Sequence, residues 1–162
     1  MASIWKSVAA GAIGGVAAVA AMNAYQAVVN AVSKKVSCGP ALNLDDAATL
    51  DIAKAIAEAM CGFELSEAQE RCAFLTVQYS VGVALGAIYG FLAERFPATA
   101  KGAGTGFGAA AWLLGDEIAV PLLGFTNSPE YRSLSGHANA LAGHVVFGAA
   151  TDAARKLLLR AI

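Results

Sequence analysis

The sequence predicts an all-α integral membrane protein, a four-helix bundle with an additional amphipathic helix in the first loop. Three observations support this prediction. Hydrophobic residues make up 57% of the 162 residues and charged residues only 14%, whereas soluble domains carry about 25% charged residues. The mean hydropathy is +0.58, so a soluble protein of this size would lack the polar surface needed to cover itself. Uncharged stretches also recur at the length, about 20 residues, that a helix needs to cross the hydrocarbon layer.

The first predicted span covers residues 5–32, because no charged residue lies between Lys6 and Lys34. A cleavable signal peptide is the alternative, since Lys6 is followed by an apolar run and by small residues. The run is longer than the hydrophobic region of about 7–15 residues in a usual signal peptide. We therefore expect a membrane span here.

The segment 33–71 is polar and is expected to lie outside the membrane. Within it, residues 45–60 place Ile52 and Ile56 on one face of a helix and the charged residues Asp51, Lys54 and Glu58 on the other. This pattern predicts an amphipathic helix that lies against the bundle or the lipid headgroups.

Three further spans follow along the same single multi-pass domain, which covers residues 1–162. Ser66 and Gln69 have the spacing of a capping box, which predicts the start of a helix whose uncharged part forms the second span, 72–94. The third span, 101–123, and the fourth, 134–156, contain ionisable residues. Four spans put both termini on one side of the membrane. A small excess of Lys and Arg on that side favours cytoplasmic termini.

Composition also excludes other classes of protein and site. A net charge of −1 and a pI of about 6.1 give no basic field that would attract nucleic acid. Cys38, Cys61 and Cys72 have no CxxC spacing and no neighbouring histidine, so they do not indicate a zinc site. Two of them forming a disulfide and all three remaining reduced are both compatible with the sequence.

Glycines recur at a spacing of four residues in three of the predicted spans. This spacing lets helix backbones approach closely, which matters in lipid because apolar burial alone does not drive helices together. The glycines expected to pack helices are Gly11, Gly15, Gly82, Gly86, Gly90, Gly104 and Gly108.

Every predicted span contributes polar residues to the same half of the bilayer, within about 15 Å of one surface at 1.5 Å per residue. Ionisable groups at such depths are costly and call for partners or a water-filled cavity. We therefore expect a hydrated pocket that opens toward the long first loop. Its predicted lining is Asn23, Gln26, Gln78, Asp116, Glu117, His137 and His144.

The two histidines are two helical turns apart and so share one face. Asp116 and Glu117 are neighbours rotated by about 100°, so at most one is expected to point straight at that face. Structural hydrogen bonding between helices is one interpretation. A carboxylate and imidazole pair that binds or passes protons or small ions is the other.

A divalent metal held by His137, His144 and Glu117 is a weaker alternative, because helical ligand pairs usually follow the HExxH spacing, which is absent. No nucleophile motif such as GxSxG occurs either. We therefore predict no catalytic residues, no enzyme activity and no cofactor. At the opposite surface, Glu94, Arg95, Asp152 and Arg155 are interpreted as solvated interface charges.

The chain resembles the YagU family of small bacterial inner-membrane proteins, a family of unknown molecular function. The resemblance covers most of the chain and implies a multi-pass inner-membrane location and a loose link with acid resistance. It implies no reaction. The residues that carry it are the stretch 11–23, then Gly82, Gly86, Tyr89 and Gly90, then Trp112, Asp116, Glu117, Pro121 and Gly124, and finally His137, Leu141, His144, Phe147, Gly148 and Thr151.

Together these features predict a proton- or ion-responsive inner-membrane protein with a role in acid stress. Its expected partners are the lipid bilayer, protons or small ions, and a second copy or other membrane subunits. The first alternative is a structural or assembly subunit of a larger membrane complex, in which the glycine faces bind other subunits. A metal-binding membrane enzyme is the more distant alternative.

Overall fold

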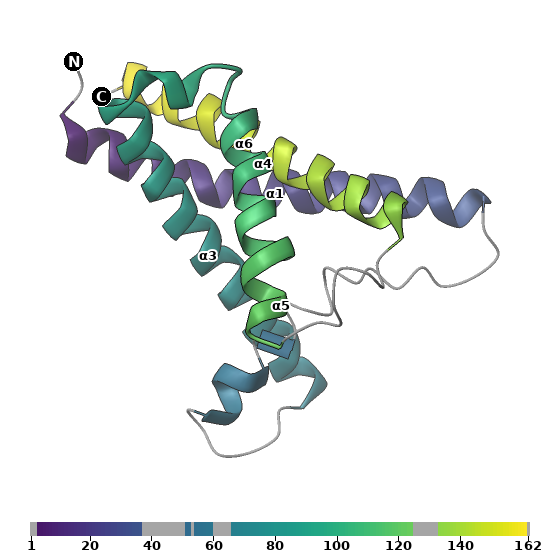
Figure 1. Ribbon diagram of the computed structural model, residues 1–162. Helices are drawn as coiled ribbons and strands as arrows, with labels where there is room; N and C mark the ends of the chain where they lie inside the picture. Colours follow the sequence, from purple (N-terminus) through teal and green to yellow (C-terminus); the bar gives the residue numbers. More distant parts are fainter. Residues whose placement is uncertain (1–2, 37–50, 53, 60–65, 125–132, 162) are drawn as a thin grey trace.

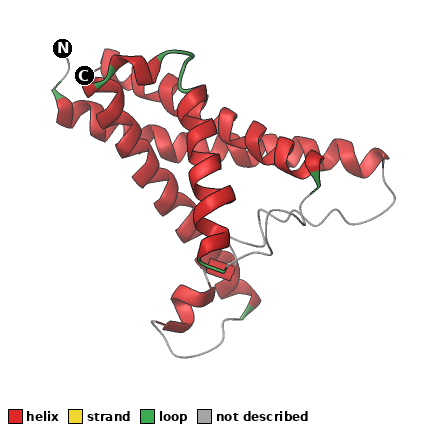
Figure 2. Cartoon of the chain, viewed as in Figure 1, coloured by secondary structure: helices red, strands yellow, loops and turns green. Residues whose placement is uncertain are grey.

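A computed structural model of the chain describes residues 3–36, 51–52, 54–59, 66–124 and 133–161. In these ranges all regular secondary structure is helical (Figure 2), which confirms the all-α prediction for this part of the chain. The elements are α1 (Ile4–Val36), α3 (Glu67–Arg95), η1 (Pro97–Ala100), α4 (Thr105–Trp112), η2 (Leu113–Ala119), α5 (Val120–Leu122) and α6 (Leu134–Ala161).

Two of the predicted spans coincide with helices long and apolar enough to cross a membrane. Among the described residues these are the segments Ile4–Val32 of α1 and Gln69–Arg95 of α3. The predicted spans 101–123 and 134–156 correspond to a helical run divided into α4, η2 and α5, and to α6. Their membrane insertion remains a prediction.

The amphipathic segment is described only in part. Residues 51–52 and 54–59 are helical, whereas both ends of the predicted range 45–60 lie outside the described residues. Lys54 pairs with Glu70 of α3 at 2.8 Å, so this helical segment is tied to the start of α3. Cys38 and Cys61 also lie outside the described residues, and Cys72 is an exposed free thiol.

The start of α3 follows the capping-box prediction. The backbone N–H of Ser66 donates to Gln69 Oε1 at 2.9 Å, which satisfies one of the donors that a helix leaves unpaired at its first turn. The helix therefore begins at Glu67 and contains the whole of the predicted second span.

Helices α1 and α3 pack antiparallel with their backbones in close contact. A Cβ atom added at Gly11 would overlap the carbonyl oxygen of Gly86, and one added at Gly15 would overlap that of Gly82. A Cβ at Gly90 would meet the carbonyl oxygen of Ser7 in the same way. The glycine spacing in both helices therefore fits a crossing at which any larger side chain would force the helices apart.

Helix α6 lies along the other side of α1, and α4 packs on α6 through glycines (Figure 1). A Cβ at Gly104 would overlap the carbonyl oxygen of Gly148, and one at Gly108 would overlap that of His144. Gly104 also has a φ of 78° at the start of α4, a conformation that L side chains rarely adopt. This packing fixes η2, which continues α4, beside the histidine face of α6.

Among the described residues, many large apolar side chains are exposed, whereas several polar side chains are buried. The interior contains small residues and buried polar side chains, and its apolar cluster is built on Ala18, Val19 and Phe147. Large apolar side chains instead cover the outer faces of the helices. Among the most exposed are Trp5, Ile13, Val28, Leu114, Leu122, Leu123, Leu134 and Leu157. Exposed apolar side chains of this kind are typical of surfaces that contact lipid or other proteins.

Candidate functional site

A cavity of about 260 Å³ lies between α1, α3, α6 and the run from α4 to α5. Five of the seven residues expected in a pocket line it, and they are Asn23, Gln26, Gln78, Asp116 and His144. The other two, Glu117 and His137, contact each other and are not part of the lining. Ile52, from the short helical segment before α3, completes the wall.

The amides of Asn23 on α1 and Gln78 on α3 form a reciprocal pair. Asn23 Nδ2 donates to Gln78 Oε1 at 3.1 Å, and Gln78 Nε2 donates to Asn23 Oδ1 at 3.0 Å. Because each amide satisfies the other, the pair joins the two helices at the edge of the cavity without using a charge. This arrangement is typical of polar contacts between helices in lipid.

A second group of hydrogen bonds, from a tyrosine and two amide side chains, links α1 to α6. The Tyr25 hydroxyl donates to Asn139 Oδ1 at 3.0 Å, and Asn139 Nδ2 donates to Gln26 Oε1 at 3.0 Å. The buried Nε2 of Gln26 has no hydrogen-bond partner among the described residues. Tyr25 and Asn139 were not among the predicted pocket residues, although Asn139 stands two residues after His137 in an otherwise apolar run.

Asp116 and Glu117 lie on η2, a turn of π-helix that continues α4. Such turns replace the i→i+4 hydrogen bond with a wider i→i+5 bond and are frequent at functional sites. The backbone N–H of Val120, the residue that follows this π-helix, donates to the carbonyl of Gly115. This bond has the wider i→i+5 spacing. The two carboxylates therefore sit on a locally widened stretch of helix that faces α6.

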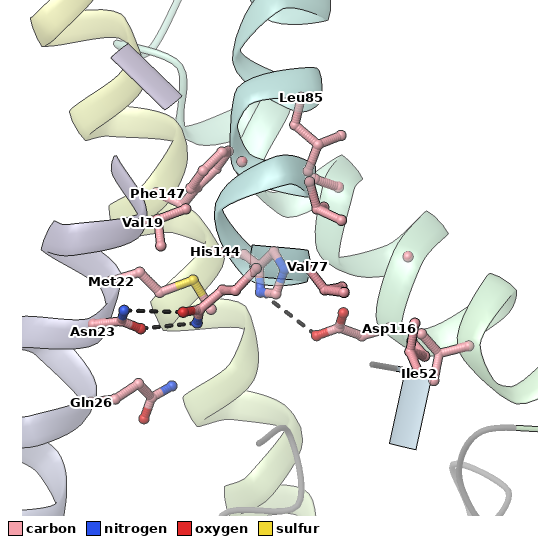
Figure 3. A pocket seen from close by; sticks show the side chains of 16 residues that line it. Val19, Met22, Asn23, Gln26, Ile52, Val77, Leu85, Asp116, His144 and Phe147 are labelled. Carbon is pink, nitrogen blue, oxygen red and sulfur yellow. Dashed lines mark hydrogen bonds and ion pairs between the residues drawn. The ribbon is translucent and has the colours of Figure 1, made fainter. Parts of the chain in front are cut away.

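His144 approaches Asp116 at the cavity wall (Figure 3). Its Nδ1 lies 3.7 Å from Asp116 Oδ2, too far for a hydrogen bond but close enough for an ion pair when the imidazole is protonated. The same Nδ1 lies 3.1 Å from the carbonyl oxygen of Ala140. A carbonyl only accepts, so Nδ1 carries a proton and Nε2 is the nitrogen that takes up the second one.

His137 forms the closer pair, with a hydrogen bond of 2.8 Å between its Nδ1 and Glu117 Oε1. Both side chains are largely buried, with 23% of His137 and 12% of Glu117 exposed. Each of the neighbouring acids thus contacts a different histidine.

Of the two acids only Asp116 lines the cavity, as the expectation of a single inward-facing acid requires, although both acids contact a histidine of α6. The two histidines lie seven residues apart on α6, so their side chains are two turns apart along the helix axis. The π-helical turn also alters the rotation between successive side chains that an α-helix would impose. Both carboxylates can consequently reach α6.

The opposite end of the cavity is apolar. Val19, Leu85 and Phe147 lie together at one side of the cavity, while Asn23, Gln26 and Asp116 lie at the other (Figure 3). Val19 and Phe147 are only 4% exposed and belong to the hydrophobic core cluster, against which Leu85 packs. The polar groups therefore gather toward the end at which α3 begins.

A second polar cluster lies at the other end of the bundle, near both termini. Tyr89 donates to Asp152 Oδ1 at 2.8 Å, and Lys156 donates to Asp152 Oδ2 at 2.6 Å. Arg155 donates to the hydroxyl of Ser7 at 2.8 Å and to Glu94 Oε2 at 3.2 Å. These bonds join α1, α3 and α6.

The interpretation of Asp152 and Arg155 as solvated interface charges is therefore wrong. Asp152 is 1% exposed and Arg155 6% exposed. Burial is tolerated because every charge has an opposite partner and further hydrogen bonds. The tight glycine packing of α1 on α3 and of α4 on α6 is what encloses them, whereas Arg95 stays exposed and lies over the ring of Phe96.

The described residues contain no group of three His, Cys, Asp or Glu side chains that could hold a metal ion. His137 and His144 instead engage separate carboxylates. The chemistry that the arrangement offers is proton uptake and release between imidazole and carboxylate groups.

Comparison with known proteins gives one match. A family model described as "Protein of unknown function (DUF1440)" matches residues 15–153, a range that contains both histidines, both acids and the three amides of the cavity. No curated protein and no solved structure matches the chain.

Proposed function

The chain belongs to the DUF1440 family, whose function is unknown, and we propose that it is a multi-pass inner-membrane protein that responds to protons or small ions. It acts through the Asp116, Glu117, His137 and His144 side chains and without covalent chemistry. The bound species are protons or small ions rather than an organic cofactor.

The observation that carries this proposal is the pairing of each acid on η2 with a histidine on α6. An imidazole beside a carboxylate changes its contacts when it gains or loses a proton, and histidine titrates near physiological pH. The pairs connect two helices rather than neighbouring residues of one helix. Protonation therefore alters the attraction between η2 and α6.

The apolar exterior supports the membrane location. At the end that holds both termini, Trp5 is 80% exposed and Phe96 51% exposed. They stand beside the exposed basic residues Lys6 and Arg95. Aromatic and basic side chains at one level are typical of the headgroup region. The resemblance to the YagU family favours the same inner-membrane location and a loose link with acid stress, and the small excess of Lys and Arg on the side of the termini favours cytoplasmic termini.

Trp112 provides a reporter for the test. It is the last residue of α4, directly before η2, and its buried Nε1 has no hydrogen-bond partner among the described residues. In a Trp5→Phe background, its fluorescence in nanodiscs should change with pH. The change should be reduced in Glu117→Gln or His144→Gln protein that remains folded and inserted, because each variant removes one of the two pairs, and it should persist in full in the control Tyr25→Phe. A full pH response in both neutralised variants would refute the proposal.

An assembly subunit remains the second candidate, because the exposed apolar side chains suit contacts with other membrane proteins. The glycine faces do not suit that role. They are filled within the chain by the contacts of α1 with α3 and of α4 with α6. An assembly role would therefore use the aliphatic outer faces, and it predicts defined membrane subunits that copurify with the protein and are lost on polar substitution of Leu122 or Leu134.

A further inference from the structure

We propose that the cavity exchanges protons and water with one side of the membrane only, the side at which α1 ends and α3 begins. This inference rests on the proposed function, since it assigns the compartment whose pH reaches His144 and Asp116. The protein would then report the pH of one compartment and would not conduct protons across the bilayer.

The floor of the cavity blocks passage toward the termini. Val19 on α1, Leu85 on α3 and Phe147 on α6 converge there (Figure 3). Val19 and Phe147 are almost completely buried. An apolar barrier without polar partners does not hold water, because a buried water needs two to four polar groups around it.

Beyond this apolar floor, toward the termini, the helices are in backbone contact. Between the floor and the termini, Gly11, Gly15 and Gly86 bring α1 against α3 so closely that not even a methyl group would fit. On the other side, Gly104 and Gly148 do the same for α4 and α6. The contact between α1 and α3 and the contact between α4 and α6 are therefore both closed at this level.

The charged cluster at the terminal end completes the seal. Asp152 accepts from Tyr89 and Lys156, and Arg155 donates to Ser7 and Glu94. These charges are held in fixed pairs, and Phe147 and Thr151 separate them from His144 along α6. Thr151 is fully buried and donates to the carbonyl oxygen of Phe147, so it offers no free donor to a proton chain.

The polar end of the cavity has the opposite character. His144 faces Asp116 from η2, while α1 and α3 supply the uncharged amides of Asn23, Gln26 and Gln78. The pair of Glu117 and His137 lies close by on the same two elements, η2 and α6. The titratable groups therefore lie on one side of the apolar floor, toward the end of α1 and the start of α3.

Cysteine accessibility tests this route in proteoliposomes. In a background with Cys38, Cys61 and Cys72 replaced by serine, the variants Ala111→Cys on α4 and Val77→Cys on α3 each place a thiol in the cavity lining. A charged, membrane-impermeant methanethiosulfonate is then supplied from one side at a time. Arg71→Cys and Lys101→Cys, both at exposed positions, mark the two sides, and Thr151→Cys marks the sealed region.

We expect Ala111→Cys and Val77→Cys to be labelled from the Arg71 side and labelling to be lost when the reagent is supplied from the Lys101 side. Thr151→Cys should be labelled from neither side. Labelling of both cavity variants from the Lys101 side, from both sides or from neither would overturn the inference. These outcomes do not depend on Trp112 fluorescence, so one-sided labelling with no pH response would refute the proposed function alone.

Discussion

The carboxylate of Asp116 lies 3.7 Å from Nδ1 of His144, across the contact between η2 and α6. One residue further along, Glu117 lies 2.8 Å from His137. Adjacent acids thus reach histidines that stand two helical turns apart. The two pairs form a polar connection between η2 and α6, next to the glycine packing of α4 on α6.

Substitution at the α1 and α3 crossing should destabilise the bundle. In Gly86→Ala the new methyl group would overlap the carbonyl of Gly11, and such overpacking costs about 1–3 kcal/mol. The measurement is the free energy of unfolding in mixed micelles. Gly106→Ala is the matched control, because nothing lies within 4 Å of that position and alanine favours helix by about 0.5–1 kcal/mol. Equal stabilities for the two variants would contradict the close packing.

The buried pair of Arg155 and Glu94 should respond strongly to neutralisation. Glu94→Gln leaves the Arg155 guanidinium buried without its counter-charge, and breaking a buried pair in this way costs about 3–5 kcal/mol. Arg95→Gln removes an exposed neighbour and should change stability by less than about 0.5 kcal/mol. Thermal unfolding of both variants checks the difference, and a mild effect of Glu94→Gln would mean that Arg155 is hydrated.

A double-mutant cycle should detect the amide pair of Asn23 and Gln78. The single variants Asn23→Ala and Gln78→Ala each remove both reciprocal bonds, so the double variant should lose little more. Hydrogen bonds between membrane helices give coupling energies of about 0.6 kcal/mol on average and up to about 1.7 kcal/mol. Strictly additive effects on the free energy of unfolding would argue against direct contact.

The contact between Lys54 and Glu70 should depend on pH. The hydrogen bond from the Lys54 ammonium to Glu70 raises the pKa of Lys54 above its ordinary value. A raised lysine pKa stabilises the contact fully below the ordinary value, and the contribution is lost as the pH rises through the folded-state value. Spin labels at positions 58 and 71 should therefore report a constant distance at neutral pH and a wider distribution in strongly alkaline solution. Glu70→Gln should already show the wider distribution at neutral pH.

The sequence was sufficient to predict the helical class and the positions of the packing glycines. Glycine at every fourth position has a direct physical consequence in a helix, since it opens one face for a close neighbour. Gly11, Gly15 and Gly86 accordingly lie at one crossing. The sequence also predicts that one pocket contains Asn23, Gln78, Asp116 and His144. This prediction follows from the depth of each residue along its helix.

Other features depend on information that helical periodicity does not contain. The π-helical turn around Asp116 is a local change in hydrogen bonding, and a regular α-helix was the natural expectation. The burial of Asp152 and Arg155 depends on how α1 and α3 close over the end of α6, which residue type alone does not reveal. The contact of Tyr25 with Asn139 requires the register between α1 and α6.

The most direct test of the central claim is a pH titration of His137 and His144 by NMR in nanodiscs, with metal content determined on the same sample. Because each histidine contacts its own carboxylate, the pH profile of the His144 signals should differ between the wild type and Asp116→Asn, and that of the His137 signals between the wild type and Glu117→Gln. Single, independent titrations that neither variant alters would contradict the account and leave the histidines as structural contacts between helices.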